Sequence, residues 1–415
     1  MKKGEKILYL NGELDCLAYY IAVARALEKF LAGRMIATRI WIPKMNIPYF
    51  IPWITQSDKN AVKKAMSQRW LTNGPILKQF EEKIQIYTKT KYAIGVGSAT
   101  HALHLAVRSL GIGQGDEVIV PTFTFAATAN AASYSGAKPI LADVDEKSFN
   151  ITPKEIQKRI TRKTKAVIVV HYGGQACDMN EIQKICNKLN LFLIEDCAHA
   201  LGSEFSNKKC GSIGDIGCFS FYPTKIITTG EGGMVTTQHK ALADKIHILR
   251  SHALNIDSYK REKLAAWKYD IIDLGYNYRL DELRSALGLS QLSRINKINK
   301  MRQNIAKIYD KYLSKIRGIS IPEISYGRNH IYHLYTIKIE DDYHYTRDEL
   351  YNKLQKNGVG ASVQYWPLHL MTYNKNKYNT QSFPNANSLK EKVLSLPIFP
   401  KMTRKQIDFV ISLIK

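Results

Sequence analysis

The chain has 415 residues and a mass of 47.2 kDa, which is too large for one ordinary domain, so we expect two or three. Hydrophobic residues make up 45% and charged residues 23%, as in folded globular proteins, and these values exclude a disordered or fibrous chain. Lys and Arg number 60 against 36 Asp and Glu, a net charge of +24. This surplus favours an anionic partner, such as a nucleic acid or a phosphorylated small molecule, or it reflects the Lys- and Asn-rich composition that an AT-rich genome gives.

The six cysteines carry no signature of a metal site. They include no C-x-x-C pair and no His at zinc-finger spacing, and a chain of this size needs no disulfides. We therefore expect no metal ion and a reducing, cytoplasmic location. The apolar run at 16–24 follows acidic residues and is soon interrupted by Arg25 and Glu28, so it predicts neither a signal peptide nor a transmembrane helix.

Residues 1–44 are expected to form an N-terminal extension, with a helix from about 14 to 37. It is either an extra packing helix or sequence upstream of a start at Met45, and a membrane or partner-binding role is the less favoured alternative. Beyond it we predict a large domain at 45–285 and a smaller C-terminal α+β domain at 286–415.

From Lys91 onward, short apolar segments alternate with longer helical ones. Ser98 and Thr152 stand at helix N-caps. We predict strands at 92–97, 116–121, 138–144, 165–173 and 191–198, and helices at 98–111 and 152–160. This alternation predicts an α/β fold with a mostly parallel sheet and helices on both faces, in which ligands bind at the carboxyl ends of the strands.

The C-terminal part follows a different pattern. We predict one long helix from about 283 to 316, strands near 333–339 and 361–366, and a final helix at 403–415. This order of elements is that of an α+β domain.

The first candidate site is the segment from Gly95 to Thr100, where two glycines lie between a strand and a helix. Free backbone N–H groups and the positive end of the helix dipole can bind a phosphate there, with the Thr100 hydroxyl as a further donor. A dinucleotide site would need a third glycine at position 100 and an acid at the end of the next strand, and the chain has neither. A plain tight turn is the alternative.

The second candidate is Asp196, at the end of the apolar run LFLIED. A carboxylate there must face a cation or a solvated cleft, because burying it unpaired is costly. A protonated pyridine nitrogen is one suitable cation. A helix cap or a salt bridge is the structural alternative.

The third candidate is Lys225, which lies between Ser220 and a group of three glycines that ends at Gly233. Desolvation just beyond a strand can lower the pKa of such a lysine and prepare it for Schiff-base chemistry. Phosphate site, acid and lysine together match the three anchors of pyridoxal phosphate: phosphate, ring nitrogen and aldehyde. Phe123 or Phe125 could stack on the ring, with ordinary core packing as the alternative.

The chain also resembles the DegT/StrS family of pyridoxal-phosphate sugar-nucleotide aminotransferases, which have the aspartate-aminotransferase fold (fold type I). The resemblance covers about residues 46–415. It rests on the ordered motifs WLTNGP (70–75), GSAT (97–100), TFTFAATAN (122–130), EDCAHALGS (195–203), SFYPTK (220–225), GEGG (230–233), GYNYRLDE (275–282), HLY (333–335) and the segment 383–400. The first 44 residues have no counterpart, and Gln364 stands where many relatives have His.

The resemblance implies roles for individual residues. Lys225 would bond to the cofactor aldehyde and move protons, and Asp196 would pair with the ring nitrogen. Asn277 would reach the cofactor phosphate of the neighbouring subunit, which implies a homodimer with shared sites. The remaining implied cofactor contacts are Phe125 on the ring, His199 near its phenolic oxygen, and Ala99, Thr100 and Ser220 on the phosphate; the implied substrate contacts are Thr72, Asn73, His333 and Tyr365.

The expected function is transfer of an amino group from glutamate, with glutamine as the alternative donor, to a nucleotide-linked keto-deoxysugar in amino-sugar or surface-polysaccharide biosynthesis. A 4-keto-6-deoxyhexose is the first expectation, and 3-keto sugars and cyclitol ketones are the alternatives. A non-catalytic basic binding protein on the same scaffold is the competing hypothesis. No zinc finger, RNA-binding signature or dense basic run supports it, so we expect neither nucleic acid nor membrane as a partner.

Overall fold

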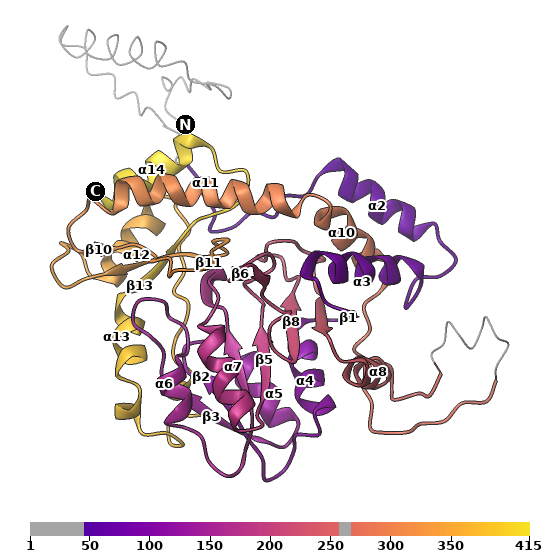
Figure 1. Cartoon of the computed structure of the whole chain (residues 1–415). Coiled ribbons are helices and arrows are strands. Elements are labelled where there is room, and N and C mark those ends of the chain that lie inside the picture. Colours follow the sequence, from indigo (N-terminus) through magenta and orange to yellow (C-terminus); the bar gives the residue numbers. More distant parts are fainter. Residues whose placement is uncertain (1–44, 257–266) are drawn as a thin grey trace, which may run out of the picture. The chain divides into compact units, whose positions relative to one another are not determined.

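A seven-stranded sheet lies at the centre of the molecule (Figure 1). Its strand order is β1-β9-β8-β5-β4-β2-β3. The five strands β8, β5, β4, β2 and β3 are parallel to their neighbours in this series, and β9 runs antiparallel to both β1 and β8. The strands are β1 (Tyr92–Val96), β2 (Glu117–Pro121), β3 (Lys138–Ala142), β4 (Thr164–Val170), β5 (Phe192–Asp196), β8 (Ile216–Ser220) and β9 (Gly233–Thr237). The predicted α/β class with a mostly parallel sheet is confirmed.

The structure is a computed structural model and describes residues 45–256 and 267–415. The predicted extension at 1–44 and its helix lie outside the described residues. From Asn46 to Lys415 the chain forms one compact unit, and the division at 285/286 stays a prediction. Within the described residues, no helix is both long and apolar enough to cross a bilayer.

Two apolar cores cover the two faces of the sheet. Alternation along β2 sends Val118 and Val120 into one core and Ile119 into the other. The first core contains residues of α4 (Ala99–Ser109), α5 (Ala126–Tyr134) and α8 (Lys240–Leu249). The second contains residues of α3 (Pro75–Thr88), α6 (Pro153–Gln157) and α7 (Met179–Lys188). Burial on both faces explains why the parallel strands are almost continuously apolar.

Helix starts follow the predicted caps. The Ser98 hydroxyl accepts a hydrogen bond from the N–H of His101, and the Thr152 hydroxyl accepts one from the N–H of Glu155. Both bonds satisfy backbone donors that the first helical turn leaves free. The cap at Ser98 fixes α4 directly after β1, at the carboxyl edge of the sheet.

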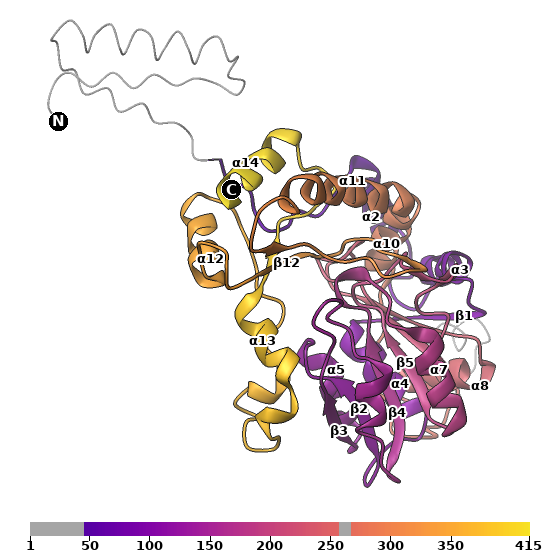
Figure 2. The same cartoon turned by 60° about the vertical axis from the view of Figure 1, so that its left-hand side comes forward.

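The C-terminal part contains a second, antiparallel sheet in the order β10-β12-β13. Figures 1 and 2 show α11 and α14 side by side above it, and the two helices are in contact. The elements are α10 (Glu282–Leu292), α11 (Ile295–Leu313), β10 (Ile319–Ser320), β12 (Tyr335–Ile339), α12 (Arg347–Lys356), α13 (Pro384–Lys392), β13 (Val393–Leu396) and α14 (Arg404–Ile414). The smaller elements are α2 (Gln56–Met66), β6 (Glu204–Phe205), β7 (Lys208–Lys209), β11 (Arg328–Asn329) and the short 3-10 turns η1 (Tyr172–Gly174), η2 (Leu368–Leu370) and η3 (Thr380–Ser382).

Two sequence predictions in this part are wrong. The long helix at 283–316 is two helices, because the chain leaves helical geometry at Arg294, whose guanidinium bonds to Asp58 and to the carbonyl of Trp53. The strand predicted at 361–366 does not form, and only an isolated bridge joins Ser362 to Ser395. The carbonyl of Gln364 accepts a hydrogen bond from the Tyr172 hydroxyl instead of joining a ladder.

Candidate active site

Lys225 lies in the turn that follows β8. Its backbone N–H donates to the carbonyl of Tyr222 at 2.9 Å, and its side chain is half-buried. Burial lowers the pKa of the Lys225 amine to about 8, and the Asp196 carboxylate acts in the opposite direction. A substantial fraction of this amine is therefore neutral in mildly alkaline solution, and a neutral amine is a nucleophile.

Asp196 is the last residue of β5, and it is only 5% exposed. One carboxylate oxygen accepts from the N–H of Ala198 at 3.1 Å, and the other accepts from the Thr128 hydroxyl at 2.9 Å. Burial raises the pKa of Asp196, although these hydrogen bonds and the charge of Lys225 oppose the shift. A buried carboxylate of this kind is suited to pair with a cationic ring nitrogen.

The start of α5 brings an aromatic ring to the same place. Phe125 is the N-cap residue of α5 and is 63% exposed, whereas Phe123 is buried in the core. Of the two aromatic candidates, Phe125 is thus the accessible one. Thr128 follows one helical turn later, so it lies on the same face of α5 as Phe125. Sequence reasoning missed Thr128, although its spacing from Phe125 was a usable signal.

His199 and Tyr365 form a hydrogen-bonded pair. The His199 Nδ1 accepts from the N–H of Gly173 at 3.3 Å, and its Nε2 lies 2.9 Å from the Tyr365 hydroxyl. Because Nδ1 is an acceptor, the ring proton lies on Nε2 and is donated to the Tyr365 oxygen. The Tyr365 hydrogen then remains available to a further acceptor.

Two histidine rings lie next to each other here. The rings of His199 and His333 are 4.3 Å apart between centroids, and burial together with neighbouring positive charge holds the pKa of each well below its usual range. Both are therefore neutral hydrogen-bonding groups near Lys225. Of the predicted substrate residues, His333 and Tyr365 belong to this group.

The predicted phosphate residues meet around Gly233. Ser220 pairs with Gly233 between β8 and β9, and a Cβ on Gly233 would lie 2.5 Å from the Ser98 carbonyl and 2.8 Å from the N of Ala99. Only a glycine allows this approach. The first turn of α4, with Ala99 and Thr100, therefore lies beside Ser220 at one edge of the sheet, where a helix N-terminus can bind an anion.

The remaining predicted residues form a separate group. Asn277 pairs through its backbone with Ser251, and its side chain is exposed. Thr72 pairs with Asp281, and the amide of Asn73 lies 3.5 Å from the Ser251 hydroxyl. The contacts of the described residues thus connect these three to 251 and 281, and not to Lys225 or Asp196.

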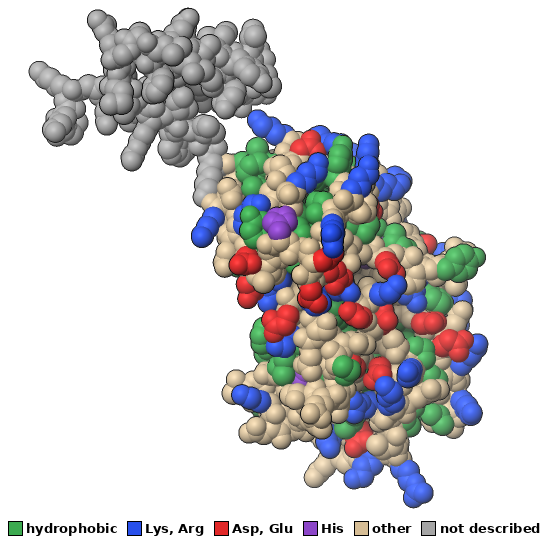
Figure 3. Space-filling model, turned by 90° about the vertical axis from the view of Figure 1, so that its left-hand side faces the viewer, with side chains coloured by type: hydrophobic (Ala, Val, Ile, Leu, Met, Phe, Trp, Pro, Cys, Tyr) green, Lys and Arg blue, Asp and Glu red, His purple; other side chains and the backbone are tan. Residues whose placement is uncertain are grey.

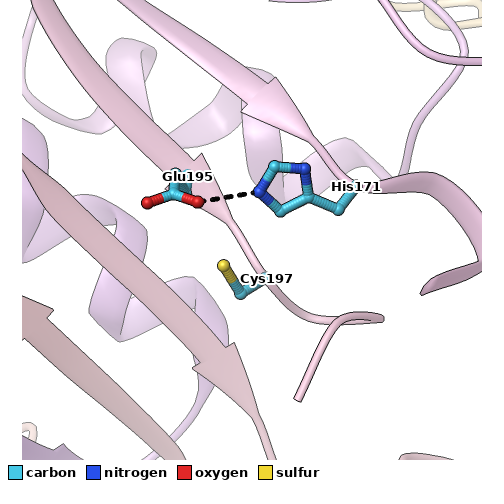
Figure 4. Close-up of side chains that lie close together, drawn as sticks. All are labelled: His171, Glu195 and Cys197. Carbon is cyan, nitrogen blue, oxygen red and sulfur yellow. Dashed lines mark hydrogen bonds and ion pairs between the residues drawn. The ribbon is translucent and has the colours of Figure 1, made fainter. Parts of the chain in front are cut away.

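A buried cluster behind Asp196 was not predicted. Figure 4 shows His171, Glu195 and Cys197 close together. The His171 Nε2 lies 2.9 Å from a Glu195 oxygen. Glu195 and His171 were invisible as a pair in the sequence because they come from two different strand ends. Glu195 of this pair directly precedes Asp196 on β5.

A model of the DegT/DnrJ/EryC1/StrS aminotransferase family matches residues 52–415 of the chain. The chain belongs to this family. The aminotransferase is 41% identical over 373 residues to an uncharacterized protein, MJ1066, of Methanocaldococcus jannaschii, covering 89% of this chain and 97% of the relative. It is 37% identical over 374 residues to the spore coat polysaccharide biosynthesis protein SpsC of Bacillus subtilis, with coverage of 89% and 96%.

The fold is also that of solved relatives. The PLP-form of Spr1654 from Streptococcus pneumoniae superposes with a TM-score of 0.84 at 29% identity, covering 89% of the aminotransferase and 98% of Spr1654. The aminotransferase is a PLP-dependent enzyme of fold type I, as the sequence predicted. Because the chain belongs to this family, it is an enzyme and not a non-catalytic binding protein.

The residues of the candidate site fit pyridoxal phosphate. The amine of Lys225, the buried carboxylate of Asp196 and the glycine-lined edge beside α4 offer an aldehyde partner, a ring-nitrogen partner and a phosphate site. When bound, the cofactor supplies an electron sink for the carbon that loses or gains the amino group.

Proposed function

We propose that the aminotransferase moves an amino group from glutamate to the keto carbon of a nucleotide-linked deoxysugar, with a 4-keto-6-deoxyhexose as the first substrate to test. The observation that carries the proposal is that the half-buried Lys225 lies close enough to the buried carboxylate of Asp196 for the charge of each to act on the pKa of the other. The name of SpsC, a polysaccharide biosynthesis protein, supports the sugar substrate.

Each residue has a proposed part in the reaction. Lys225 holds the cofactor aldehyde and moves a proton, while Asp196 keeps the ring nitrogen protonated. Phe125 packs against the ring, and His199 lies near its phenolic oxygen. The proposed phosphate contacts are Ala99, Thr100 and Ser220, and the proposed substrate contacts are Thr72, Asn73, His333 and Tyr365.

The proposal includes a cytoplasmic homodimer with shared active sites. Next to the exposed Asn277, the segment 267–274 presents large apolar side chains to solvent, with Trp267 at 78%, Ile271 at 65% and Leu274 at 70% exposure. Exposed apolar groups of this density are typical of a protein interface. A second copy packed on this segment would bring its Asn277 toward the phosphate site.

The face drawn in Figure 3 supports a small-molecule substrate over a nucleic acid. On the face drawn in Figure 3, lysines and arginines alternate with acidic side chains and form no continuous basic patch. A nucleic-acid surface would need basic groups gathered along one face. We propose that the net charge of +24 reflects composition.

The test is a substrate panel. The purified enzyme is given glutamate or glutamine with UDP-, dTDP- and GDP-linked 4-keto and 3-keto sugars and a cyclitol ketone, and products are identified by mass spectrometry. The proposal predicts an amino sugar nucleotide from glutamate and a 4-keto-6-deoxyhexose. Amination of a 3-keto sugar or a cyclitol alone would replace this substrate by one of the alternatives.

A further inference from the structure

His171 and Glu195 form a buried pair. Hydrogen bonds already occupy the lone pairs of both side chains that could otherwise bind a metal ion. Both side chains are fully buried. Besides His171, the Glu195 carboxylate accepts three backbone N–H groups at 2.7–2.8 Å, from Gly211, Ile213 and Gly214. Four donors on two oxygens fill the acceptor sites of a carboxylate, so the cluster with Cys197 is not suited to metal binding.

The hydrogen bonds fix one tautomer of His171. Its Nδ1 accepts the N–H of Cys177 at 3.1 Å, so the ring proton lies on Nε2 and is donated to Glu195 at 2.9 Å. Removing either partner would leave a buried polar group unsatisfied, which is more costly than the loss of the bond alone. The ring therefore has one orientation.

His171 and Glu195 hold the backbone at Asp196 in place. Glu195 and Asp196 are neighbours on β5, so their side chains point to opposite faces of the sheet. The backbone N–H of His171 donates to the carbonyl of Asp196 at 3.3 Å. Glu195 thus fixes one face of the strand end, and His171 joins this strand end to the end of β4.

The same pair also controls His199. The ring of His171 bonds to Cys177, six residues later, and so closes the loop that contains η1. Within this loop, the N–H of Gly173 donates to the Nδ1 of His199. The orientation of His199, and through it the bond to Tyr365, therefore depends on the closed loop.

We infer that His171 and Glu195 are positioning residues of the cofactor site, which hold Asp196 and His199 in place through the backbone of two strand ends and one loop. The inference rests on the proposed role of Asp196 as the partner of the ring nitrogen. It concerns the chain's own geometry and is independent of which sugar is the substrate.

Two substitutions at His171 separate its two bonds. His171→Asn keeps an acceptor near the Nδ1 position but cannot reach Glu195, whereas His171→Gln keeps a donor near the Nε2 position. The experiment measures cofactor affinity and the pH titration of bound-cofactor absorbance in the full-length holoenzyme. We expect His171→Asn to bind the cofactor roughly ten-fold more weakly, as for a lost hydrogen bond to a charged group, and to shift the titration in the direction of Asp196→Asn. His171→Gln should restore the titration midpoint.

Asp58→Asn is the matched control. Asp58 is also a fully buried carboxylate with several donors, including Ser290 and Arg294, but it is a residue of α2 and bonds to α10, outside the candidate site. We expect a lower melting temperature with an unchanged titration. A shift in Asp58→Asn equal to that in His171→Asn would overturn the inference, because any loss of stability would then suffice.

The comparison with Asp196→Asn distinguishes two failures. If Asp196→Asn shifts the titration and His171→Asn binds and titrates like the wild type, the positioning inference alone fails. If Asp196→Asn itself leaves the titration unchanged, the proposed role of Asp196 fails, and the inference fails with it. Neither measurement uses a sugar substrate.

Discussion

At the scale of single residues, the site depends on two opposed effects of burial. The same desolvation that lowers the pKa of the Lys225 amine raises the pKa of the Asp196 carboxyl, and the attraction between the two charges limits both shifts. Titratable groups with such shifted pKa values are typical of active sites. The pair thus offers a nucleophilic amine and a buried acid at one strand edge.

The shifted pKa of Lys225 predicts how the apoenzyme captures its cofactor. Below its pKa of about 8 the amine is protonated and unreactive, so the capture rate should rise with pH through about 8 and then level off. Stopped-flow absorbance at a series of pH values measures this curve. A midpoint near 10, as for a solvated lysine, would contradict the burial that the structure gives Lys225.

Asp196→Asn should bind the cofactor through the phosphate contacts and lose nearly all transamination. The amide has the shape of the carboxyl group but not its charge, and it cannot keep the ring nitrogen protonated. Single-turnover kinetics with glutamate measure the loss without any sugar. Turnover at the wild-type rate would show that Asp196 is a structural cap of the following turn.

At the scale of secondary-structure elements, α5 couples Phe125 to Asp196 through Thr128. The Thr128 hydroxyl donates to Asp196 and accepts from the Thr124 hydroxyl, so the first turn of the helix is fixed to the end of β5. The hydrogen bond between Thr128 and Asp196 joins residues that are 68 positions apart in the sequence.

Thr128→Val should reduce the rate of the half-reaction with glutamate about ten-fold, because Asp196 loses one of its two hydrogen bonds while the shape of the side chain is kept. Thr128→Ser is the matched control, since it keeps the hydroxyl and should remain close to the wild type. Equal losses in both variants would mean that the methyl group, and not the hydroxyl, is what the site needs.

The elements also show what the sequence could and could not predict. The strands β1 to β5 and the caps Ser98 and Thr152 were predictable, because apolar runs and capping residues act locally. The break between α10 and α11 was not, because it depends on the bonding of Arg294 to Asp58, 236 residues away. The His171–Glu195 pair escaped for the same reason, whereas Thr128 was missed although its spacing from Phe125 was a usable signal. The order of motifs in the sequence predicted Lys225 and Asp196 as site residues. Which side chains bond to them and hold them in place is visible only in the folded chain.

At the scale of the whole molecule, the predicted site residues other than the phosphate contacts and Phe125 fall into two groups. Asp196, His199, His333 and Tyr365 lie near Lys225, whereas Thr72, Asn73 and Asn277 gather around Ser251 and Asp281. The exposed side chain of Asn277 is free to reach a second copy of the chain. The proposed dimer would complete each site with Asn277 of the partner subunit.

Asn277→Ala should weaken cofactor binding about ten- to hundred-fold, as for a lost hydrogen bond to a charged group, and leave the dimer intact. Mixing it with Lys225→Ala tests shared sites. After random exchange of equal amounts, half of the dimers are hybrids with one intact site of two, so about a quarter of the wild-type activity should return. Verified exchange without any activity would place Asn277 in its own subunit's fold.

The most direct test of the central claim is chemical fixation of the cofactor. The purified enzyme should be yellow, and sodium borohydride should remove its long-wavelength absorbance band by reducing the bond between cofactor and lysine. Peptide mapping by mass spectrometry then locates the pyridoxyl group. The structure predicts that it is found on Lys225, and a pyridoxyl group on any other lysine would contradict the assignment of the active site.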